Sequence, residues 1–152
     1  MINEIMLQKN FEIIDTLAKW RSMTTENLKA LVAESDKAPA FRQRILRLEE
    51  GGLLRSKLQK GINKIVYPSR ELLQRLGIEN FNEDNIKHDA AVSMVISNLL
   101  TFSMISSGKL PHEYKTKSTW RHHAIEPDAI ITAGKGTNEL VIAVEVELFR
   151  KD

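Results

Sequence analysis

The sequence contains no cysteine, which excludes a disulfide scaffold, a thiol nucleophile and any metal site with cysteine ligands. Only 7 glycines and 4 prolines occur among the 152 residues, which argues against a fibrous or loop-rich chain. No apolar run reaches the ~18 residues that a membrane-spanning helix needs. The N-terminal segment carries acidic residues where a signal peptide has its apolar core. These absences predict a soluble cytoplasmic protein.

The composition that remains is that of an ordinary globular protein, with 42% hydrophobic and 28% charged residues. The formal net charge of +2 is unevenly distributed. Residues 1–77 hold 14 Lys and Arg against 9 Asp and Glu, a net +5, whereas residues 78–152 hold 8 against 11, a net −3. A basic half followed by an acidic half predicts two domains, 1–77 and 78–152, that bind different partners.

In the first half, helical spacing and capping signals predict three helices, and alternation predicts a hairpin. Apolar residues recur at helical spacing over 2–21, and Thr24 and Thr25 precede a second short helix. A third helix begins near Pro39 and ends at the Gly51-Gly52 pair. Two strands and a short helix are expected over 53–59, 64–69 and 70–77. This order of elements predicts a winged helix-turn-helix domain.

The third helix has one apolar and one basic face. Phe41, Ile45 and Leu48 share the face that is expected to pack inward, whereas the opposite side carries arginine and glutamine. In a winged helix this side would enter the major groove of duplex DNA, and cations of the hairpin would contact phosphates. The alternative is a solvated basic face on a winged helix that binds protein. The predicted DNA-binding residues are Arg42, Gln43, Arg44, Arg47, Arg55, Lys57, Lys60 and Lys64.

In the second half, a long apolar helix is expected over 84–108, followed by strands at 116–122, 125–132 and 139–149. The turn at 133–138 joins the last two strands as a hairpin. Strand alternation puts Glu145 and Glu147 on one face, and the hairpin brings Asp128 opposite residues 143–145. Three carboxylates on one face repel each other unless a cation compensates them, and Mg²⁺ prefers such ligands. The alternative is simple amphipathic alternation with the acids facing solvent.

The order of an apolar helix, a strand, Pro127-Asp128 and then Glu145-Val146-Glu147 resembles the PD-(D/E)xK nuclease superfamily. The resemblance implies Mg²⁺-dependent hydrolysis of phosphodiester bonds, with Asp128 and Glu145 as metal ligands. Glu147 occupies the position of the family's lysine, as it does in some restriction endonucleases of the superfamily. Lys151 could act as a displaced substitute for that lysine. The implied catalytic residues are Asp128, Glu145, Glu147 and Lys151.

The whole chain resembles a narrower group, the replication-relaxation family, which includes MobC-class plasmid relaxases. The resemblance lies in the winged-helix order, His88-Asp89 near the start of a helix, EPDAII and AVEVELFRK. It implies an α+β protein whose winged helix precedes a truncated restriction-endonuclease-like module. It also implies binding to double-stranded DNA of a plasmid or other mobile element during replication, relaxation or conjugative transfer.

Two alternatives to this function stay open: an active metal-dependent nuclease or relaxase, and a winged-helix transcription regulator whose second half dimerises or senses a ligand. The nuclease core of the superfamily continues beyond the ExE strand, whereas this sequence stops at Asp152. The second module is therefore expected to be a shortened relative, a fragment, or a sheet completed by a partner chain. Because the last strand would otherwise leave an exposed edge, a homodimer is expected.

Overall fold

The structure is a computed structural model that describes residues 3–59, 62–79, 81–114 and 126–148. It has an α+β fold, as predicted, with two antiparallel three-stranded sheets among the described residues. The chain divides into two compact units, Met1–Ala90 and Ala91–Asp152, each described here by itself. No helix of the described residues is long and apolar enough to cross a bilayer.

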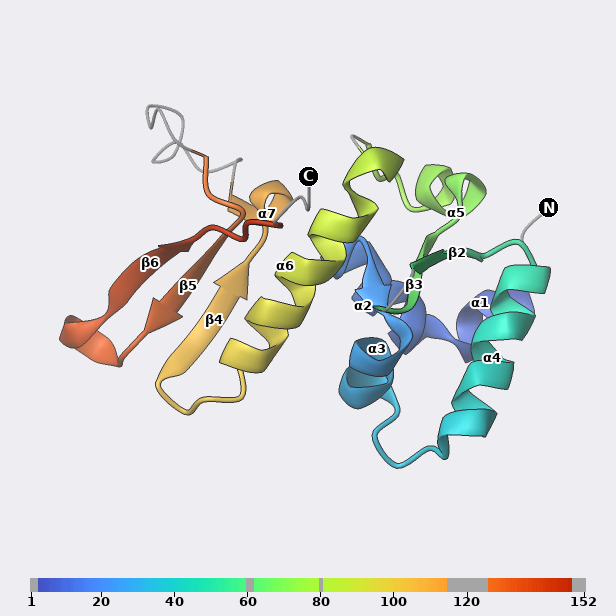
Figure 1. The fold of residues 1–152 in the computed structure, drawn as a ribbon, viewed down its shortest axis with the longest axis horizontal. Helices are drawn as coiled ribbons and strands as arrows, with labels where there is room; N and C mark the ends of the chain where they lie inside the picture. The colour runs from blue at the N-terminus through green and yellow to red at the C-terminus, as the bar shows by residue number, and fades with distance from the viewer. Residues whose placement is uncertain (1–2, 60–61, 80, 115–125, 149–152) are drawn as a thin grey trace. The chain divides into compact units, whose positions relative to one another are not determined.

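In the first unit, the helices α1 to α4 precede a hairpin of two strands (Figure 1). Its sheet has the order β1-β3-β2, with β3 paired antiparallel to both neighbours. The hairpin and the two helices that were predicted after Thr24 and near Pro39 are present, whereas the two-residue strand β1 was not predicted. The elements are α1 (Glu4–Lys9), α2 (Phe11–Trp20), β1 (Met23–Thr24), α3 (Thr25–Val32), α4 (Ala38–Glu50), β2 (Leu54–Gln59), β3 (Ile62–Pro68) and α5 (Arg70–Arg75).

The helix expected over 2–21 is wrong as a single element, because it breaks at Asn10 into α1 and α2. The Asn10 side chain makes the break stable. Its Nδ2 donates to the Met6 carbonyl at 2.8 Å, and its Oδ1 accepts from Arg44 Nε at 2.6 Å. Asn10 is almost fully buried, and a buried amide needs such partners.

The core of the first unit confirms the predicted inward face of the third helix. Phe41, Ile45 and Leu48 on α4 are each 1% exposed. Ile13, Ile14 and Leu17 on α2 are buried at the helical spacing that the sequence shows. The helical phase of α4 is therefore the one that leaves Arg47 outside.

The first unit extends beyond the expected boundary at Gly77, because the start of the next helix belongs to its core. This helix is α6 (Ile86–Leu99), and it follows the short turn η1 (Glu83–Asn85). Ile86 and Ala90 pack with Ile65 and Tyr67, and Ser22 Oγ donates to the Ile86 carbonyl at 2.8 Å. The boundary between the units therefore falls inside α6.

The second unit contains the rest of α6 and the sheet β4-β5-β6. The helix expected up to Gly108 is wrong beyond Leu99, because the chain turns back and residues 105–109 pair with β5. A Cβ on Gly108 of β4 would lie 2.6 Å from Ile96 Cγ2 of α6. The absence of a side chain at Gly108 therefore lets α6 pack closely against β4. The other elements are β4 (Ile105–Lys109), α7 (Pro111–Tyr114), β5 (Ala129–Ala133), η3 (Gly136–Asn138) and β6 (Leu140–Val144).

The β5–β6 hairpin confirms the sequence prediction, with Ala129 opposite Val144 and Ala133 opposite Leu140. Gly134 opens the turn with φ 89°, and a Cβ there would lie 2.3 Å from the Asn138 carbonyl oxygen. Only glycine fits this position. β6 is shorter than the expected strand, since residues 145–148 make no ladder. The strand predicted at 116–122 lies outside the described residues.

Candidate nucleic-acid interface

The outer face of α4 presents hydrogen-bond donors that are not used within the described residues. Arg42, Gln43 and Arg47 are exposed, opposite the buried face of the helix. Neither guanidinium group takes part in a hydrogen bond or ion pair with another described residue. Pro39 lies in the first turn of α4. Backbone N–H groups there have no hydrogen-bond partner within the helix, so a proline is compatible with the start of α4 after Lys37. The guanidinium groups of Arg42 and Arg47 and the amide of Gln43 are therefore available to bind a ligand.

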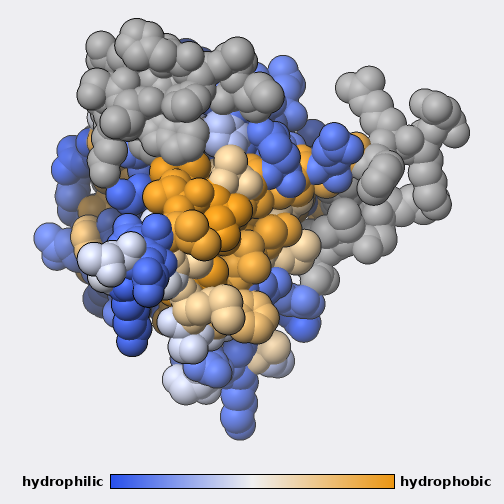
Figure 2. Space-filling model, turned by 90° about the vertical axis from the view of Figure 1, so that its left-hand side faces the viewer, coloured by the Kyte–Doolittle hydropathy of each residue, from blue (hydrophilic) through white to orange (hydrophobic). Residues whose placement is uncertain are grey.

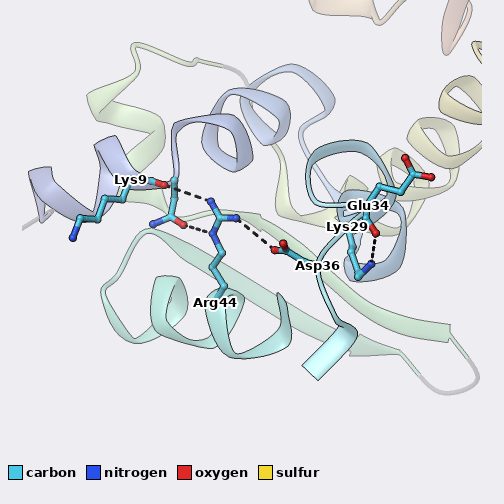
Figure 3. A network of polar contacts seen from close by, with 6 residues as sticks. Lys9, Lys29, Glu34, Asp36 and Arg44 are labelled. Atoms are coloured by element: carbon cyan, nitrogen blue, oxygen red, sulfur yellow. Dashed lines mark hydrogen bonds and ion pairs between the residues drawn. The ribbon is translucent and has the colours of Figure 1, made fainter. Parts of the chain in front are cut away.

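Arg44 differs from its neighbours because the fold itself uses its guanidinium group (Figure 3). Nε donates to Asn10 Oδ1 at 2.6 Å, and Nη2 donates to the Lys9 carbonyl at 3.4 Å. Nη1 lies 3.9 Å from the Asp36 carboxylate. Arg44 thus joins α4 to the α1–α2 break and to the turn before α4. Its contact with DNA stays a prediction, but the structure assigns it a positioning role that the sequence did not reveal.

The cations of the hairpin also divide into paired and unpaired residues. Lys57 on β2 is exposed and has no partner within the described part of the chain. Lys64 on β3 is half-buried, with its Nζ 2.5 Å from Glu49 Oε2. Arg55 forms an exposed ion pair with Glu83 at 3.5 Å. Lys60 lies outside the described residues. Lys57 is therefore the described hairpin cation with the least internal compensation.

A groove of about 430 Å³ runs between α3, α4 and β3. Lys29, Arg42 and Lys64 line it together with one acid, Glu26, and Gln43 reaches the same groove. The lining therefore carries more positive than negative charge and attracts anions. Because Lys29 comes from α3 and is far in sequence from the hairpin, the charge pattern of the sequence did not single it out.

The predicted acidic site is assembled only in part. Asp128 precedes β5 and Glu145 follows β6, so both adjoin the paired residues Ala129 and Val144 at one end of the hairpin. Asp128 Oδ2 accepts a hydrogen bond from the Val146 N–H at 2.8 Å, while Glu145 and Glu147 are exposed.

Among the described residues, no group of three or more Asp, Glu, His or Cys side chains could hold a metal ion. The expected convergence of three carboxylates is thus not seen. The physical reason is that β6 ends at Val144, so strand alternation no longer orients Glu145 and Glu147. Lys151 lies outside the described residues, and binding of a metal by Asp128 and Glu145 stays a prediction.

Comparisons of the chain with protein-family models, curated proteins and solved structures found no match.

Proposed function

We propose that residues 1–90 form a winged helix-turn-helix that binds double-stranded DNA. In this proposal α4 lies in the major groove and the β2–β3 hairpin lies against the sugar-phosphate backbone. The observation that carries it is the outer face of α4, where Arg42, Gln43 and Arg47 are exposed and neither guanidinium group has a partner among residues 3–59, 62–79, 81–114 and 126–148. The order of α2, α3 and α4 before the hairpin, together with the sheet β1-β3-β2, supports the same proposal.

The chemistry of these side chains suits base recognition. Arginine presents a fork of donors that matches the two acceptors on the major-groove edge of guanine, and glutamine matches adenine in the same way. Because Arg42 and Arg47 form no hydrogen bond or ion pair with any residue that the structure describes, no such contact has to break before they bind a base. Lys57 and the cationic groove beside α4 supply charge for phosphates, which position the protein without reading sequence.

The biological target in this proposal is an origin of replication or transfer on a plasmid or other mobile element. The choice of an origin as the target is supported only by the resemblance to the replication-relaxation family. The alternative target is a promoter, with residues 91–152 serving as a dimerisation or sensing unit. Duplexes drawn from origin and promoter regions of the same replicon, compared for affinity, separate the two.

Lys57→Ala is expected to weaken binding to all duplexes alike and to reduce the slope of log K against log salt by about 0.9, the value of one lost phosphate contact. Lys64→Ala is the matched control on the adjacent strand, and it should change the slope less because Glu49 already compensates its charge. Fluorescence anisotropy with labelled duplexes over a range of salt concentrations measures both slopes. Equal slopes for the two variants and the unchanged protein would show that Lys57 does not contact DNA.

A metal-dependent nuclease is the second candidate, and one observation favours it: Asp128 and Glu145 adjoin the paired residues Ala129 and Val144 at the same end of the β5–β6 hairpin. We expect supercoiled plasmid incubated with the protein and Mg²⁺ or Mn²⁺ to shift on a gel without being nicked. The reasons are that Glu147 stands at the lysine position and that the Asp128 carboxylate already accepts from the Val146 N–H. Nicking that is lost in both Asp128→Ala and Glu145→Ala would contradict this and establish the nuclease.

A further inference from the structure

Strand β6 is apolar throughout, and within the described part of the second unit its side chains are exposed on both faces, with Val144 half-buried. It forms one edge of the sheet β4-β5-β6. Leu140 is 65% exposed, Val141 58% and Ile142 42%, although alternate residues of a strand point to opposite faces. Figure 2 shows a broad apolar patch on the side of the molecule where this sheet lies. Hence α6, which packs against β4, does not shield β6.

This exposure is unusual for the edge of a sheet. Natural edge strands are protected from pairing by lysines, prolines, bulges or short length, and β6 contains no charged residue or proline among its five positions. A continuous apolar run is instead typical of a strand buried on both faces inside a sheet. The composition of β6 is therefore that of an interior strand, whereas its position in this sheet is at the edge.

The charges around β6 indicate what kind of strand fits beside it. Glu139 precedes it, and Glu145 and Glu147 follow it, all three exposed. Two copies of β6 paired antiparallel about Ile142 would put Glu139 of each copy opposite Glu145 of the other. Like charges directly opposite each other destabilise a strand pair, whereas opposite charges stabilise it. The flanks of β6 thus disfavour a second copy and favour a strand with cations at its ends.

We propose that an extended segment of a partner protein adds to β6 as the next strand of the sheet. The segment is apolar at its centre and carries Lys or Arg on both sides, opposite the glutamates that flank β6. Main-chain hydrogen bonds to the edge of β6 that no described strand occupies would supply affinity, and the terminal cations would supply selectivity. This interaction is independent of DNA binding, because its residues all lie in the second unit.

The test uses the full chain and a capped peptide with alternating valine and threonine between two terminal lysines. Its matched control carries glutamate at both ends. Calorimetry is expected to show at least about tenfold tighter binding of the lysine peptide, with an affinity that falls as salt rises. Hydrogen exchange should show new protection of the β6 amides. Equal affinity for the two peptides, or no binding at millimolar concentration, would overturn the proposal.

Two variants localise the effect. Ile142→Lys places a charge in the middle of β6 and should abolish peptide binding, while its partial exposure lets the fold persist, as circular dichroism would verify. The double variant Glu139→Lys with Glu145→Lys should reverse the preference in favour of the glutamate peptide. A stable dimer of the chain alone that is lost in Ile142→Lys would show that a second copy covers β6, and it would contradict the proposal.

Discussion

Replacing Arg42 and Arg47 by alanine is expected to cost about 1–3 kcal/mol of binding free energy for each arginine on the preferred duplex. This corresponds to roughly five- to 150-fold in affinity per residue. The reason is that both arginines are exposed on α4 and that their guanidinium groups are unpaired in the described part of the chain, so each is available for a bidentate contact to a base. Anisotropy titrations against a duplex selected from a randomised pool, and against an unrelated duplex, measure the loss.

Comparing the loss of affinity for the two duplexes distinguishes base recognition from nonspecific attraction to the DNA charge. Binding to the selected duplex should fall much more than binding to the unrelated one, because only the former uses base contacts. Arg70→Ala is the matched control, since it removes one exposed arginine from α5 and leaves α4 intact. An equal loss on both duplexes, or an equal loss in Arg70→Ala, would show that α4 contributes only charge.

Ile45→Ala is expected to lower the free energy of unfolding by about 2–5 kcal/mol. Ile45 is 1% exposed and sits between Phe41 and Leu48 on the buried face of α4, so truncation removes apolar contacts and leaves a cavity. That loss is a large share of the stability of a small domain. Urea denaturation followed by circular dichroism measures the change in the midpoint at constant slope.

The neighbouring residue provides the control for this experiment. Leu46 is 42% exposed on the same helix, so Leu46→Ala should change stability by only about 0.5 kcal/mol. A similar cost at both positions would mean that the helical phase of α4 differs from the one described. The face that carries Arg42 and Arg47 would then be misassigned as well.

The phase of α4 could be predicted from the sequence because it depends on local periodicity alone. Apolar residues at 41, 45 and 48 define one face of a helix whatever it packs against. The break at Asn10 could not be predicted in this way. It depends on a hydrogen bond from Arg44, a residue 34 positions away, and no local signal reports such a partner.

The difference between local patterns and long-range contacts also explains the wrong predictions for the second unit. Residues 105–108 directly follow an apolar helical stretch and were included in the predicted helix, yet they belong to β4, which pairs with β5 and packs Gly108 against Ile96. Alternation correctly predicted the β5–β6 hairpin, since turn residues and strand parity are local. It could not predict that β6 ends at Val144, which decides how Glu145 and Glu147 are oriented.

The most direct test of DNA binding through α4 and the hairpin is the salt dependence of affinity of the unchanged protein for a labelled duplex. The proposed interface predicts binding that tightens steeply at low ionic strength, with log K falling linearly as log salt rises and a slope of about −0.9 for each phosphate contacted. Anisotropy measured over a series of salt concentrations gives the slope directly. Absence of salt-sensitive binding to any duplex at low ionic strength would contradict the proposal that this protein binds DNA.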